Sequence, residues 1–127
     1  MKIENLKLLL KKKKNVISEK SLKFAVRIVK FYQYLCDEKK EYVLSKQVLR
    51  SGTSIGANVR ESRNAQSDAD FINKLNIALK EADETQYWLE LLRLSGIISE
   101  ESFDSLNNDL KELIAILVSV IKTMKTK

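Results

Sequence analysis

The chain has 127 residues, 44% of them hydrophobic, and a formal net charge of +6. This length suits one domain with a single core, and a chain with no proline and three glycines favours helices over a β-sandwich or barrel. One cysteine excludes an intramolecular disulfide and predicts a cytoplasmic protein, and we find no secretory signal or membrane-spanning segment.

The positive charge is concentrated at the start of the chain. Residues 1–14 hold six lysines and one glutamate, a net charge of +5, whereas the rest of the chain carries only +1. We therefore divide the chain into a basic, amphipathic or frayed extension over residues 1–17 and a helical domain over residues 18–127. The extension is either a contact for nucleic acid or another anionic surface, or a solvated tail.

The first two periodic segments predict helices over residues 18–39 and 45–66. Each begins at a serine, Ser18 and Ser45, which are good N-cap residues.

The third and fourth helices have clear end signals. Ser67 with Asp70 three positions later is a variant of the capping box, and Gly96 suits the left-handed position that follows a helix. The last helix runs from the candidate N-cap Ser99 to about Thr123. Because the connections are short, the sequence predicts an all-α, antiparallel up-and-down four-helix bundle.

Two of these helices carry more apolar surface than one bundle core needs. The first has an apolar arc of roughly 220°, where a core-facing stripe needs little more than 100°. The third has a second apolar side with Leu92 among its members. We therefore expect a homo-oligomer whose interface uses Phe31, Tyr32, Ile77, Trp88 and Leu91.

The stretch "LRSGTSIGANVRES" from position 49 holds two of the three glycines, Gly52 and Gly56. A nucleotide-binding P-loop needs a lysine directly after its last glycine, but Ala57 stands there and no strand signal precedes the stretch. As a helix, the stretch places both glycines on one smooth face. We interpret Gly52 and Gly56 as helix-packing residues that permit close approach of a neighbouring helix.

The opposite face of this predicted helix is basic. Lys46, Arg50 and Arg60 lie on it, and Arg63 falls toward the apolar side. Two interpretations are open: these cations are solvated and paired with carboxylates such as Glu81 and Glu84, or they form a surface for RNA or DNA. Pairing of Arg50 and Arg60 with carboxylates would weaken the second interpretation.

We find no catalytic constellation and no candidate metal ligands or cofactor site. The chain has no histidine, so it lacks the usual neutral-pH base and the usual bundle metal ligand. Cys36 lies on the apolar arc of the first helix, where a core role is the simplest reading. The sequence predicts a non-enzymatic protein.

The segments "SGTSIGAN", "ALKEADET" and "YWL" together resemble the bacterial family of proteins encoded within intervening sequences of 23S rRNA genes. The likeness covers residues 18–124. It implies an up-and-down four-helix bundle similar to the accessory variability determinant of diversity-generating retroelements. That relative is a homopentamer with a basic surface that binds nucleic acid and works with a reverse transcriptase.

The resemblance thus implies a ring-like homopentamer that binds RNA or DNA without enzymatic activity. The alternative is a protein–protein interaction adaptor, for example for a reverse transcriptase, with no affinity of its own for nucleic acid. In the adaptor, the basic positions pair with Glu81, Glu84 and Glu90.

Overall fold

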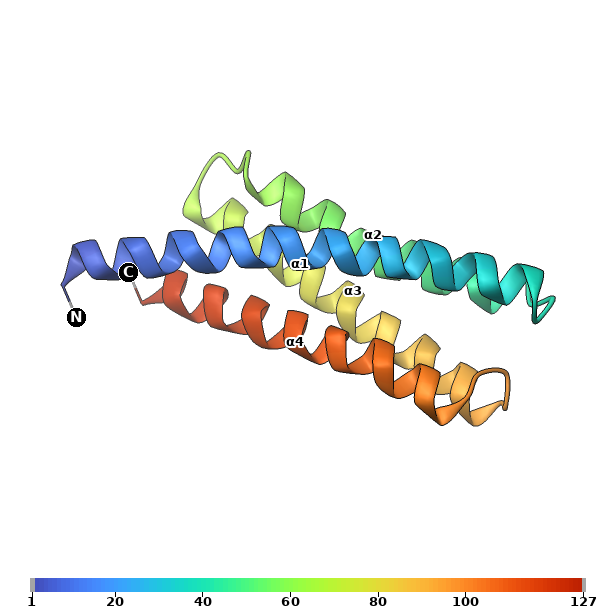
Figure 1. The fold of residues 1–127 in the computed structure, drawn as a ribbon. Coiled ribbons are helices and arrows are strands. Elements are labelled where there is room, and N and C mark those ends of the chain that lie inside the picture. The colour runs from blue at the N-terminus through green and yellow to red at the C-terminus, as the bar shows by residue number, and fades with distance from the viewer. Residues whose placement is uncertain (1, 127) are drawn as a thin grey trace.

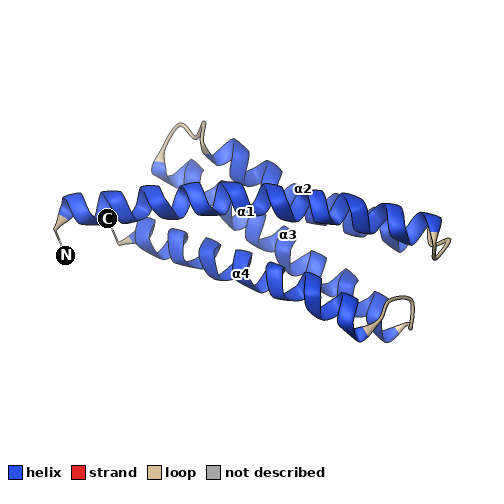
Figure 2. Ribbon diagram, viewed as in Figure 1, coloured by secondary structure: helices blue, strands red, loops and turns tan. Residues whose placement is uncertain are grey.

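The computed structural model describes residues 2–126, which form four α-helices and no strand. They are α1 (Ile3–Asp37), α2 (Leu44–Ser62), α3 (Asp68–Leu94) and α4 (Glu100–Lys125). Each helix packs against the next, and α4 packs against α1, so the predicted up-and-down bundle is confirmed (Figure 1). Short loops make the three connections (Figure 2).

The core runs along the bundle axis and receives side chains from all four helices. Its centre consists of aliphatic side chains that are fully removed from solvent. The fully buried members include Ile28, Leu35, Val48, Ile55, Leu89, Leu92, Leu110 and Leu117. Leu92 therefore belongs to the core, and its assignment to a second, outward side of the third helix is wrong.

α1 begins at Ile3, so the expected helix start near Ser18 is wrong. The reason is a seven-residue repeat that passes through the lysine-rich segment without interruption: Ile3, Leu10, Ile17, Phe24 and Phe31. Leu10 is only 7% exposed and Ile17 only 2%. Because a heptad repeat keeps one seam of a helix facing its neighbours, the bundle extends α1 through the basic segment. The division expected after residue 17 lies inside a continuous helix.

The start of α2 also differs from expectation. Ser45 lies inside the helix and is fully buried, and Val43 is the N-cap residue without a side-chain cap. Glu41 caps the helix instead, because its carboxylate accepts hydrogen bonds from the backbone N–H groups of Val43, Leu44 and Ser45 at 2.7–3.1 Å. α2 then ends at Ser62, before the expected end at Gln66.

The predicted end signals of the other two helices are confirmed. The Ser67 side chain accepts from the backbone N–H of Asp70, and the Ser99 side chain accepts from the N–H of Ser102. The Asp70 carboxylate accepts from the backbone N–H of Gln66, which completes a variant capping box. Gly96 has a φ of +75°, the left-handed conformation expected after a helix.

Candidate nucleic-acid interface

The smooth face of α2 lies against α1. A Cβ added to Gly52 would come within 2.8 Å of Cγ1 of Ile28, and one added to Gly56 would lie 3.2 Å from the backbone oxygen of Ser21. The two helices are therefore so close that a methyl group at Gly52 has no room. Gly52 and Gly56 therefore permit the close contact between α1 and α2.

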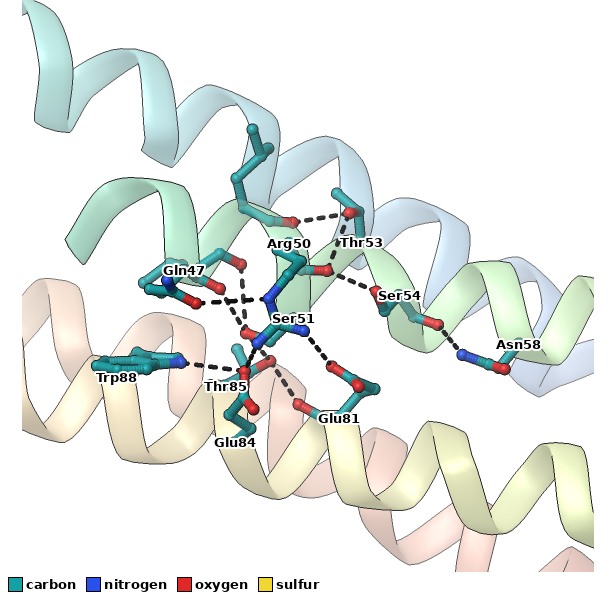
Figure 3. A network of polar contacts seen from close by, with 12 residues as sticks. Gln47, Arg50, Ser51, Thr53, Ser54, Asn58, Glu81, Glu84, Thr85 and Trp88 are labelled. Carbon is teal, nitrogen blue, oxygen red and sulfur yellow. Dashed lines mark hydrogen bonds and ion pairs between the residues drawn. The ribbon is translucent and has the colours of Figure 1, made fainter. Parts of the chain in front are cut away.

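Arg50, on the outer face of α2, is held by α3 (Figure 3). Its guanidinium forms ion pairs with Glu84 and, at 3.3 Å, with Glu81. Its Nε also donates to Oε1 of Gln47 at 3.4 Å, and the Trp88 indole N–H donates to Glu84 at 3.2 Å. The two carboxylates offset the positive charge of Arg50. Arg50 is therefore a weaker candidate for contacting phosphate groups.

The hydroxyl groups of α2 are also engaged. Thr53 and Ser54 donate to carbonyl oxygens one turn earlier in their own helix, each at 2.7 Å. Between α2 and α3, the buried Thr85 hydroxyl lies 2.9 Å from the Ser51 hydroxyl. These hydroxyl groups have acceptors within the bundle, so they are not arranged as donors for an external anion.

Lys46 and Arg60 lie exposed at opposite ends of α2, with Arg50 between them. Arg60 borders a shallow groove of about 230 Å³ between α1 and α2, which Leu22, Ala25 and Gly56 also line. The candidate cations of α2 are therefore spread along the helix and do not form one compact site.

Arg63, just after α2, lies in a different setting. It lines a groove of about 560 Å³ at one end of the bundle, together with Lys11 and Lys14 of α1. Asp68, at the start of α3, lines the same groove and brings one carboxylate to it. The structure thus places Arg63 beside the lysine-rich segment, whose position relative to the bundle the sequence interpretation left open. The heptad repeat of α1 is the signal that would have revealed it.

The C-terminal turns of α4 reach the same end of the bundle (Figure 1). Nζ of Lys13 donates to the Ser119 hydroxyl at 2.7 Å, and Met124 lines the groove beside Arg63. We call this region the basic end and define it by Lys11, Lys12, Lys14, Arg63, Lys122 and Lys125. The opposite end carries more carboxylates than cations, and its carboxylates include Asp37, Glu38, Glu41, Glu100, Glu101 and Asp104.

The residues expected at an oligomer interface have different exposures in the single chain. Phe31 is 9% exposed and belongs to the core of the bundle. Tyr32, Ile77, Trp88 and Leu91 are half-buried. The Cys36 side chain, through a hydrogen bond and through the negative charge of its thiolate form, raises the pKa of the Tyr32 phenol above its ordinary value, and burial raises it further.

Beside Tyr32, α1 carries an outward apolar stripe that the four-helix core does not use. Leu22, Val26 and Val29 follow one another at helical spacing and are 54%, 49% and 41% exposed. The apolar excess expected for α1 is therefore present on its surface.

The sequence model of the 23S rRNA-intervening sequence proteins matches residues 13–119. The chain belongs to this family. A protein of unknown function from the S23 ribosomal protein family of Bacteroides thetaiotaomicron VPI-5482, known from its crystal structure, is 63% identical to it. The likeness covers 87% of this chain and 98% of that chain, with a TM-score of 0.86. No curated protein matches the chain.

Membership of the 23S rRNA-intervening sequence protein family agrees with the four-helix fold. Within residues 2–126, no cluster of carboxylates and thiol is arranged to hold a metal ion. None of the helices in that range is long and apolar enough to span a membrane. The family match starts at Lys13, so the first turns of α1, with Lys11, precede the matched region.

Proposed function

We propose that this protein binds RNA or DNA, without catalysing a reaction, through the basic end of the bundle. The observation that carries this proposal is the continuity of α1, which brings Lys11 and Lys14 beside Arg63. Lysines on a flexible tail would have to be ordered on binding, whereas these are already presented by a docked helix.

The distribution of charge over the molecule also supports binding through the basic end. The basic end carries an excess of cations and the opposite end an excess of carboxylates, so an approaching polyanion is attracted to the basic end. Phosphate contacts of this kind give affinity without sequence specificity, and they release condensed counterions. We therefore propose the basic end as the interface, with Arg60 and Lys46 as flanking cations and Arg50 as a minor contributor.

The experiment is a titration of fluorescent RNA and DNA with the full chain at several salt concentrations. The variant Lys11→Glu/Arg63→Glu should bind roughly tenfold or more weakly and show a shallower salt dependence, because two phosphate contacts are lost. The control Lys39→Glu/Lys40→Glu makes the same change in net charge at the opposite end and should bind almost as the unchanged protein does. Equal losses in both variants, or binding indifferent to salt, would contradict the proposal.

We also propose that the protein is a homo-oligomer, for which the family resemblance implies a ring of five. The apolar stripe of Leu22, Val26 and Val29 supports this, because exposed branched residues at helical spacing are usually buried by a partner. Half-buried Ile77, Trp88 and Leu91 give α3 a second candidate contact. Several copies would multiply the basic end and raise the avidity for a long polyanion.

The mass of the assembly in solution tests the proposed oligomer. Val26→Asp should shift an oligomer toward monomers, while Lys23→Asp, exposed on the same helix, should leave the mass per particle unchanged. A monomer at micromolar concentration for the unchanged protein would overturn the oligomer proposal.

A second candidate function is a protein–protein interaction adaptor in the cytoplasm, for example one that serves a reverse transcriptase. The pairing of Arg50 with Glu81 and Glu84 favours it, because this central cation of α2 is offset within the bundle. The same titration separates the two functions. An adaptor without affinity for nucleic acid would leave both RNA and DNA unbound at low salt.

A further inference from the structure

A second seam of α1, formed by another set of residues seven positions apart, changes from apolar residues to lysines toward the basic end. This seam consists of Lys7, Lys14, Ser21, Ile28 and Leu35. Ile28 and Leu35 are fully buried and Ser21 is 1% exposed, so the seam faces the bundle interior. Lys14 therefore occupies a position that the repeat directs inward, where an apolar residue would continue the core.

The Lys14 side chain follows that direction. Its ammonium group lies 4.4 Å from the centre of the Phe71 ring, a cation–π contact with the first turn of α3. Phe71 is itself only 8% exposed. The Phe71 ring thus holds the positive charge of Lys14 above the apolar residues at the bottom of the groove at the basic end.

The rest of this groove combines apolar and cationic surfaces. Its floor is formed by Ile17, Val59, Leu75 and Met124, all at most 5% exposed and therefore set by the packed core. Lys11 comes from the turn of α1 before Lys14, and Arg63 comes from the connection between α2 and α3. The volume of about 560 Å³ lies within the range of pockets that bind small organic ligands.

Charge complementarity selects an anionic occupant. Three cations and the carboxylate of Asp68 line the groove, which leaves an excess of positive charge. An inorganic anion would use the cations but not the apolar floor. A nucleotide uses both, because it joins a phosphate to a flat, largely apolar base.

We infer that this groove receives one unpaired nucleotide of a single-stranded nucleic acid, with its phosphate near Lys11 and Arg63 and its base over the apolar floor beside Lys14. This inference rests on the proposed nucleic-acid binding and adds a preference for single strands. A base paired within a duplex is stacked on both faces and is not free to enter a groove.

The test compares the binding of a labelled single-stranded oligonucleotide with that of the duplex of the same sequence, using the full chain. Gln66 lines the groove from an exposed loop position, and Gln66→Trp should fill the groove without changing the charge. The matched control is Asn64→Trp, in the same loop and exposed but not lining the groove.

We expect the unchanged protein and Asn64→Trp to bind the single strand roughly tenfold more tightly than the duplex, about the effect of one stacked base. Gln66→Trp should lose this preference while it retains the salt-dependent affinity for the duplex.

Equal affinity of the unchanged protein for single strand and duplex would overturn the inference and leave the proposed function intact. A preference that survives in Gln66→Trp would also overturn it. Absence of any nucleic-acid binding at low salt would instead contradict the proposed function, and the inference would fail with it.

Discussion

Ile28 of α1 packs directly on Gly52 of α2, where an added Cβ would lie 2.8 Å from its Cγ1 and 2.9 Å from its Cγ2. Ile28 is fully buried and branched at Cβ, so it cannot swing away from such a contact. The glycine sets how closely the two helices approach, and with it the position of α1 along the whole bundle.

Gly52→Ala should therefore destabilise the protein by about 1–3 kcal/mol, the usual cost of overpacking a core, even though alanine is the better helix former by about 1 kcal/mol. Urea unfolding followed by circular dichroism measures the change. Gly56→Ala provides the comparison, because its Cβ would meet the Ser21 backbone oxygen at 3.2 Å, a milder contact. It should change stability by less than Gly52→Ala.

The cause can be isolated by a double-mutant cycle with Ile28→Ala. If the clash with Ile28 is responsible, Gly52→Ala should cost much less in the Ile28→Ala background than in the unchanged protein. Strictly additive effects would show that the cost of Gly52→Ala has another origin.

The cap of α2 by Glu41 predicts a stability effect at a site away from the proposed interface. Glu41→Ala should lower the free energy of unfolding by about 1–2 kcal/mol, because three backbone N–H groups lose their acceptor. Thermal unfolding is the measurement. Glu38→Ala removes an exposed carboxylate from the same connection and should be nearly neutral.

The same carboxylate should make stability depend on pH. Burial raises the pKa of Glu41, but the hydrogen bonds from Leu44, Ser45 and Val43 outweigh it and hold the pKa below its ordinary value of 4.5. The unfolded chain then binds the proton more readily, so the stabilisation is complete above 4.5 and disappears as the pH falls through the lowered pKa. The difference in stability between the unchanged protein and Glu41→Ala should shrink in that acidic range. A constant difference down to the acid transition would contradict this account.

Arg50 should matter little for nucleic-acid binding because its charge is offset by Glu81 and Glu84. Arg50→Ala should change the affinity for RNA or DNA by less than about twofold, whereas Arg63→Ala should weaken it more. Its effect on stability should be small, about 0.5 kcal/mol, because the Arg50 side chain is 49% exposed and solvent screens the pair. If Arg50→Ala lost more affinity than Arg63→Ala, the nucleic-acid interface would lie at the centre of α2 instead of at the basic end.

The docking of the first turns of α1 depends on Leu10, which is 7% exposed. Leu10→Ala should cost about 2 kcal/mol of local stability and increase amide hydrogen exchange over residues 3–13, with less effect on the middle of α1. Leu8→Ala is the control, since Leu8 is 67% exposed. Unchanged exchange in Leu10→Ala would mean that this segment is helical without help from the bundle.

The sequence by itself determined the fold class and several helix ends. Helical periodicity, short connections and the signals at Ser67, Gly96 and Ser99 depend on neighbouring residues, so they can be read from a single chain. The distribution of charge along the chain was equally visible. The repeat of Ile3, Leu10 and Ile17 also indicates the early start of α1. The closely spaced lysines between these residues made the repeat hard to recognise.

Only the tertiary structure decided what each cation faces. Arg50 meets Glu81 and Glu84 because α2 and α3 pack side by side, and Lys14 meets Phe71 because α1 continues past the loop between α2 and α3. These partners lie far apart in the sequence, and helical phase gives the side of a helix but not the neighbour that covers it. Leu92 entered the core and Ser45 became buried for the same reason, since packing between helices outweighs local preference. Glu41, four residues before Ser45, caps α2 instead.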